Sequence, residues 1–266
     1  MSSGSGGPRR RRGRETAALL TARAGYAAAL ADHTTAASAY READAHWATP
    51  PPDTDATQAR VAGLIRWSNT ERLRGHHRDA LKLLTTARDL ADQTQLGPAV
   101  QAAVANALGV LAKDTGHYAE ALVRYREPLA ALTEHDRSND ALRATVQHNL
   151  AGLAHIQGDF AAAEAPARRA VTLRRALPDA DRCVVAADET VLGAVLSGLG
   201  QLDEAEQLFR ESLEVWSARY GPGHYEVAVN LHNVAAIAQA RKQLDEADGC
   251  SATSSASSAP PSGTIT

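Results

Sequence analysis

One spacing recurs along most of this 266-residue chain and restricts its fold more than any other feature. A small residue, followed by an alanine five positions later, returns at steps of 41, 42, 42 and 42 residues. The copies open at Gly75, Gly116, Gly158, Gly200 and Lys242, and their alanines are Ala80, Ala121, Ala163, Ala205 and Ala247. A register held over four steps indicates a repeat protein.

Each period contains two helical stretches separated by the opening glycine. Apolar residues recur at helical spacing on both sides of Gly200. The glycine suits the left-handed turn that ends a helix. The alanine lets two helices cross closely, and a larger residue four positions later fills the groove beside it. That larger residue is Leu84, Tyr125 or Phe209 in three copies, and Ala167 takes the position in another. The pattern therefore predicts stacked helical hairpins.

The composition agrees with an all-helical chain. Hydrophobic residues make up 44% of the sequence but aromatic residues only 4%, and much of the apolar content is alanine. Alanine is the best helix former and allows close helix packing.

The hairpins resemble the tetratricopeptide repeat. Two copies match its pattern well: Leu108, Gly109, Gly116, Ala121 and Tyr125, and then Leu192, Gly193, Gly200, Ala205 and Phe209. The usual repeat has about 34 residues. The longer period here, and the segment "YGPGHYEVAVNLHNVAAIAQ" (residues 220–239), resemble the kinesin-light-chain subclass. The resemblance implies a right-handed α-solenoid of stacked antiparallel helix pairs, with about five and a half repeats.

We expect five divisions of the chain. They are a disordered basic arm (1–14), a degenerate first helix pair (15–48), a proline-rich connection (49–57), the solenoid (58–249) and a disordered low-complexity tail (250–266). Pro128 and Pro166 fall inside second helices, where we expect kinks or early ends.

The sixth copy starts properly but is expected to lack its second helix, which leaves its apolar face without a polar cap. Two explanations stay open. Another molecule covers that face, possible self-association included, or the chain is a shortened version of a longer protein.

The sequence carries no motif of an enzyme or a metal site. It contains no P-loop, GxGxxG, GxSxG or HExxH pattern. His148 and His155 are seven residues apart on one helix, about 10.5 Å, which is too far for a shared zinc ion. We therefore expect no catalytic residue, no metal and no cofactor.

The strongest charge feature is an N-terminal cluster of arginines. It consists of Arg9, Arg10, Arg11, Arg12 and Arg14. The rest of the chain carries 23 basic against 31 acidic residues. No aromatic residue lies nearby to stack on bases, so we favour a solvated arm over nucleic-acid binding.

No apolar run approaches the length of a membrane span, and the two cysteines have no paired spacing, so we expect a cytoplasmic protein.

In such solenoids the first helix of each pair lines the concave face, where a partner binds. Amide and basic side chains occupy these positions: Arg66, Asn69, Arg72, Asn106, Lys113, His148, Asn149, His155, Asn230, His232 and Asn233. An asparagine amide can bond both the N–H and the C=O of an extended peptide, although some of these asparagines could instead bond the adjacent helix.

The sequence therefore predicts a non-enzymatic scaffold that binds an acidic or extended peptide, or a protein segment, in its concave groove. The alternative is a sensor or regulatory fragment of a larger signalling or transcription-regulatory protein.

Overall fold

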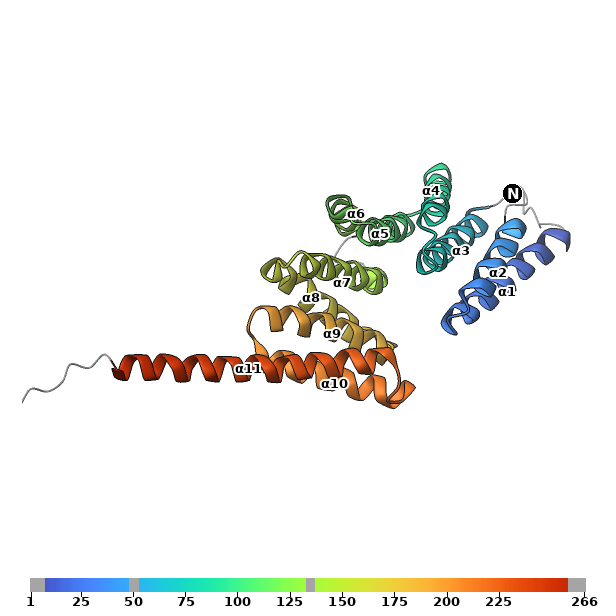
Figure 1. The fold of residues 1–266 in the computed structure, drawn as a ribbon. Coiled ribbons are helices and arrows are strands. Elements are labelled where there is room, and N and C mark those ends of the chain that lie inside the picture. Colours follow the sequence, from blue (N-terminus) through green and yellow to red (C-terminus); the bar gives the residue numbers. More distant parts are fainter. Residues whose placement is uncertain (1–7, 48–52, 133–136, 258–266) are drawn as a thin grey trace, which may run out of the picture. The chain divides into compact units, whose positions relative to one another are not determined.

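The computed structural model describes residues 8–47, 53–132 and 137–257, and Figure 1 shows that these residues form a succession of helices. They belong to two compact units, one ending at Leu153 and the other starting at Ala154. No strand occurs within the described ranges, and the helices follow one another in a repeat arrangement. The predicted all-α solenoid fold is confirmed.

The first unit contains three complete helix pairs and most of a seventh helix. Its helices are α1 (Pro8–Ala29), α2 (His33–Trp47), α3 (Thr54–Leu73), α4 (His77–Gln93), α5 (Pro98–Asp114), α6 (Tyr118–Ala131), the 3-10 helix η1 (Arg137–Asn139) and α7 (Asp140–Ile156), whose last residues pass the boundary. Each of the three pairs packs its two helices together, and α3 also packs against α5.

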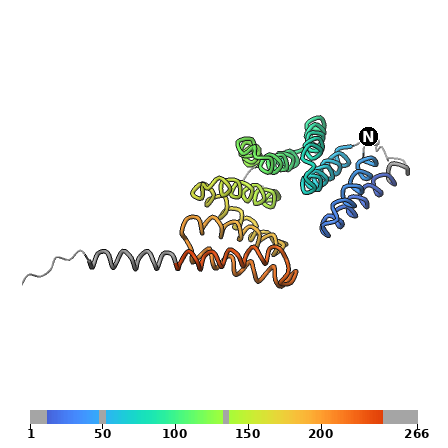
Figure 2. The backbone as a smooth tube through the Cα atoms, viewed as in Figure 1, coloured from blue at the N-terminus to red at the C-terminus, as the bar shows by residue number. Residues whose placement is uncertain are grey.

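The second unit contains the remaining helices. They are α8 (Phe160–Arg175), α9 (Arg182–Gly198), α10 (Leu202–Tyr220) and α11 (Tyr225–Ser257). Helix α9 packs against both α8 and α10, and Figure 2 traces α10 beside α11.

The repeated glycines have the backbone conformation that the sequence predicts. Gly75, Gly116, Gly158 and Gly200 have φ angles of 79°, 80°, 74° and 77°. After Gly75, the backbone N–H of His76 donates to the carbonyl of Glu71 across 2.8 Å. This bond spans six residues and belongs to the Schellman motif, which satisfies the last carbonyls of a helix. The glycine thus ends one helix and starts the hairpin turn.

The repeated alanines and the larger residues after them form the hairpin contacts. Ala80, Ala121, Ala163 and Ala205 are all fully buried. Tyr125 and Phe209 are also buried, each against a glycine of the preceding helix. A Cβ atom added at Gly109 would lie 2.6 Å from Cε1 of Tyr125, and one at Gly193 would lie 2.8 Å from Cε1 of Phe209. The glycine and the aromatic residue recur in the sequence because the same close contact between the two helices of a pair forms in both hairpins.

The first helix pair is well formed although its spacing is irregular. Ala36 and Tyr40 of α2 are buried and pack with Ala24 of α1. Helix α1 begins at Pro8, inside the stretch expected to be a disordered arm. The alanine-rich sequence that follows favours helix, and a helix propagates more readily than it starts.

The two internal prolines have different outcomes. Helix α6 has 14 residues and ends at Ala131, shortly after Pro128. Helix α8 instead continues past Pro166 to Arg175. The final helix departs from the repeat, because α11 runs through Lys242 without a turn and includes residues 250–257 of the expected tail. Lysine favours helix where the earlier copies have glycine. Residues 258–266 lie outside the described part.

Candidate functional site

In the first unit, α3 and α5 form a small cavity at residues that the sequence predicts for binding. Asn69 and Arg72 of α3 and Asn106 of α5 are part of its lining, and its volume is about 160 Å³. Ala80 and Leu84 of α4 are also part of the lining. The cavity therefore combines amide and guanidinium groups with buried apolar side chains, which suits a partner with both polar and apolar groups.

Arg72 is held in place by two neighbours. Its Nη2 donates to Oδ1 of Asn69 across 2.8 Å, and its Nη1 donates to the carboxylate of Asp114 at the end of α5. Arg72 and Asp114 are 42 residues apart, which is one repeat. The charge of Arg72 is thus already balanced within the fold, and the side chain lies across the gap between two first helices.

Asn106 and Asn149 form a second link between neighbouring repeats. The Nδ2 of Asn149 on α7 donates to Oδ1 of Asn106 on α5 across 2.8 Å. Both residues are half-buried, and neither side chain makes another hydrogen bond to the described residues. Each amide can make about four hydrogen bonds. The pair therefore has both donor and acceptor capacity left for a partner.

The other predicted residues of this unit differ in exposure. Arg66 is exposed and Lys113 is half-buried, and neither forms an ion pair with a residue that the structure describes. His148 is half-buried on α7. Arg66 and Lys113 are consequently the cations of the set whose charge is available to an acidic group.

In the second unit, Asn230 has a structural role. It is completely buried, its Nδ2 donates to the carbonyl of Glu226 across 2.9 Å, and its Oδ1 accepts from Thr190 across 3.1 Å. The alternative left open by the sequence, an asparagine that bonds the adjacent helix, therefore describes Asn230.

The remaining predicted residues of the second unit lie near its surface. The ring of His155 packs edge-on against Phe160, with 5.5 Å between centroids. His232 is exposed and Asn233 is half-buried on α11.

Metal-binding clusters and membrane-spanning helices are considered for the described ranges alone. Within them, no cluster of His, Cys, Asp or Glu could hold a metal ion. Among the same residues, no helix has the length and apolar character needed to cross a membrane.

Comparison with known families identifies the repeat. Profiles described as the tetratricopeptide repeat match residues 143–177 and residues 184–250. The chain carries tetratricopeptide repeats. Such repeats are generally non-catalytic scaffolds for protein–protein interaction. Curated protein sequences include no match to this chain.

Solved tetratricopeptide-like structures share the fold over most of the chain. BtubC (BKLC) from P. vanneervenii is 17% identical, with a TM-score of 0.62, covering 89% of this chain and 94% of that one. A structure from Podosopora anserina, described as "putative kinesin light chain nearly identical TPR-like repeats", is 18% identical. Its TM-score is 0.54, and the match covers 76% of this chain and 95% of that one. A chain of the APC/C hetero-tetramer Cut9-Hcn1 is similar at 18% identity and a TM-score of 0.59, covering 84% of this chain and 40% of that one. These likenesses establish a kinesin-light-chain-like tetratricopeptide fold.

Two polar groups near Arg72 were not predicted from the sequence. Asp114 forms an ion pair with Arg72 of the preceding repeat. The two residues are 42 positions apart, so the repeat period could have indicated that they are neighbours. Tyr125 was assigned to packing alone. Its hydroxyl is buried and has no hydrogen-bond partner among the described residues. Burial, and then the charge of Asp114, raise the pKa of Tyr125, so the hydroxyl keeps its proton and can donate.

Proposed function

We propose that the chain is an interaction scaffold whose first unit binds an extended peptide segment along α3, α5 and α7. The observation that carries the proposal is the position of Asn106. Its amide is part of the cavity between α3 and α5, and it also accepts the bond from Asn149 of the next repeat. Amides spaced along successive first helices match the repeated N–H and C=O groups of an extended backbone.

The charges of the site favour a peptide that contains acidic residues. Arg72 is balanced by Asp114, whereas Arg66 and Lys113 have no ion-pair partner among the described residues. A carboxylate that approaches α3 or α5 therefore meets unpaired positive charge. Opposite charges of this kind steer association and improve specificity, so binding should weaken as salt is added.

His148 and Asn149 continue the proposed surface on α7. His155, His232 and Asn233 remain candidates for a separate contact in the second unit. Asn230 is left out of the proposed set because it is buried and both ends of its amide are bonded.

A selection experiment tests this function. Wild-type protein and the variant Asn106→Ala/Asn149→Ala are immobilised and exposed to the same random peptide library. We expect wild type to enrich acidic, extended sequences that the double variant does not retain. A matched control, Gln93→Ala, removes an exposed amide from the second helix α4 and should enrich the same peptides as wild type. Equal enrichment by wild type and the double variant would contradict the proposal.

A further inference from the structure

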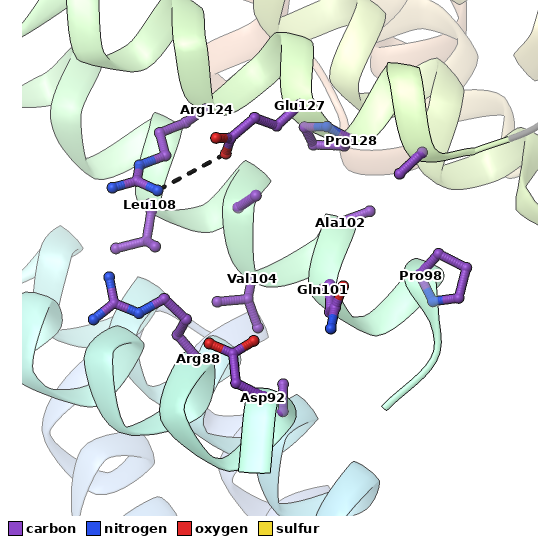
Figure 3. Close-up of a pocket in the computed structure, with 13 residues that line it drawn as sticks. Arg88, Asp92, Pro98, Gln101, Ala102, Val104, Leu108, Arg124, Glu127 and Pro128 are labelled. Atoms are coloured by element: carbon purple, nitrogen blue, oxygen red, sulfur yellow. Dashed lines mark ion pairs between the residues drawn. The ribbon is translucent and has the colours of Figure 1, made fainter. Parts of the chain in front are cut away.

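A second cavity of the first unit lies between α4, α5 and α6, as Figure 3 shows. Its volume is about 260 Å³. Helix α5 contributes one stripe of its surface, including Gln101, Ala105 and Leu108. The proposed groove uses another face of α5, with Asn106 and Val110. The two cavities therefore share a helix but expose different sides of it.

The cavity lies beside the C-terminal part of the second helix α6, which contributes Arg124, Glu127, Pro128 and Ala131 to its lining. Helix α6 has 14 residues, whereas the second helices α2, α4, α8 and α10 have 15, 17, 16 and 19. Pro128 lies close to its end and lines the cavity. A proline cannot donate a helical hydrogen bond and clashes with the preceding turn, so the helix is weakened there.

Two arginines from neighbouring second helices share one end of the cavity. Figure 3 shows Arg88 of α4 and Arg124 of α6 on either side of Leu108. The Nε of Arg124 is buried and has no hydrogen-bond partner among the described residues. Its two other nitrogens reach Glu120 and Glu127 only at 3.6 and 3.8 Å. The side chain of Arg124 as a whole is 28% exposed, so its guanidinium can still donate to an anionic acceptor that enters the cavity.

The neighbouring part of the cavity has a different chemistry. Asp92 lies one helical turn beyond Arg88, near Val104, whereas the carboxylate of Glu127 points toward Arg124 and lies 3.8 Å from its Nη1 (Figure 3). Asp92 forms no ion pair with any residue in the described ranges. A carboxylate at this position can accept a hydrogen bond from an amide N–H. The cavity thus offers two cations, one of them beside Glu127, an apolar surface at Val104 and Leu108, and an anionic acceptor at Asp92.

We propose that this cavity binds the C-terminal residue of a partner polypeptide when that residue is apolar. Its terminal carboxylate would contact Arg88 and Arg124, its side chain would lie against Val104 and Leu108, and its backbone N–H would face Asp92. The volume supports this occupant, because ligand pockets usually measure about 300–1,000 Å³ and this cavity is slightly smaller. It accommodates one large side chain with its carboxylate.

The probe is N-acetyl-leucine, which carries the carboxylate, the apolar side chain and the amide N–H, but no ammonium group. Binding to the full chain is followed by two-dimensional NMR. We expect saturable shifts of amides in α4, α5 and α6, with a Kd on the order of 1 mM for so small a ligand. N-acetyl-leucinamide, which lacks the carboxylate, should produce none of these shifts. Equal binding of both compounds, or binding of neither, would overturn the proposal.

Variants locate the binding. Arg88→Gln/Arg124→Gln should raise the Kd for N-acetyl-leucine by about tenfold or more, because two charge-assisted hydrogen bonds are lost. Ala105→Leu fills the cavity without changing a charge and should have the same effect, with circular dichroism confirming that each variant is folded. The groove variant Asn106→Ala/Asn149→Ala should bind N-acetyl-leucine as wild type does. The cavity proposal can therefore fail while the proposal of peptide binding along α3, α5 and α7 stands, and the reverse. Tighter binding of free leucine than of N-acetyl-leucine would show a free amino-acid site and contradict a chain end.

Discussion

Replacing Gly109 by alanine tests the packing that defines the repeat. A Cβ atom at this position would lie 2.6 Å from Cε1 and 2.8 Å from Cδ1 of Tyr125, and 3.2 Å from Cβ of Arg124. The Tyr125 ring is fully buried, so it cannot move into solvent. The ring or helix α6 must therefore shift.

Two opposing terms set the size of the effect. An alanine in a helix interior is favoured over glycine by about 1 kcal/mol. Overpacking of a filled core costs about 1–3 kcal/mol. We expect Gly109→Ala to lower the free energy of unfolding by about 1 kcal/mol after the propensity gain is included.

Gly152→Ala is the matched control. Gly152 also lies inside a helix, but a Cβ atom there would meet nothing within 4 Å. The control should therefore gain about 1 kcal/mol of stability. Urea unfolding followed by circular dichroism measures both variants at the same temperature.

A double-variant cycle shows whether Tyr125 is the cause. In a Tyr125→Leu background the clash with the ring disappears and the 3.2 Å contact with Cβ of Arg124 remains, so Gly109→Ala should become stabilising, with a coupling of about 2 kcal/mol between the two positions. The reasoning is refuted if Gly109→Ala stabilises the wild-type chain as much as Gly152→Ala does.

Two further predictions concern ion pairs in the second unit. Hydrogen bonding to Arg168 lowers the pKa of Glu204 below 4.5, so the pair stabilises the fold above about pH 4.5 and loses its effect as the pH falls through the lowered pKa. The stability difference between wild type and Glu204→Gln, measured by thermal melting, should therefore be constant near neutral pH and shrink in acid; a difference that grows in acid would contradict this. Asp188→Asn removes the carboxylate that accepts from the buried Arg174 across 2.9 Å, and should cost about 3 kcal/mol in urea unfolding. A loss below about 0.5 kcal/mol, typical of a surface pair, would contradict that expectation.

The sequence predicts the hairpins well because their determinants are local or strictly periodic. In four copies the turn glycine has a positive φ and the alanine five positions later is buried, as predicted, whereas α11 runs through Lys242 without a turn. Such a signal survives low identity to other repeat proteins, because it encodes close helix crossing and a left-handed turn.

The candidate site was only partly predictable, because a helix face does not reveal which side chains bond one another. Asn106 and Asn230 looked alike in sequence, yet one lines a cavity and the other is buried with both amide ends bonded. The sequence places Arg72 on the predicted binding face but does not show that Asp114 already pairs with its charge. The cavity between α4, α5 and α6 is lined by side chains of three helices, and the repeat period does not show which of them leave space between them.

The most direct test of the account is the affinity of one library-selected acidic peptide for the groove. Its Kd is measured by fluorescence anisotropy for wild type, Gln93→Ala and Asn106→Ala/Asn149→Ala, with thermal melting to confirm that all three are folded. Loss of two amide side chains, each worth about 1 kcal/mol in hydrogen bonding, should weaken binding by about tenfold or more, while Gln93→Ala leaves it unchanged. The same affinity for all three proteins would contradict peptide binding along α3, α5 and α7.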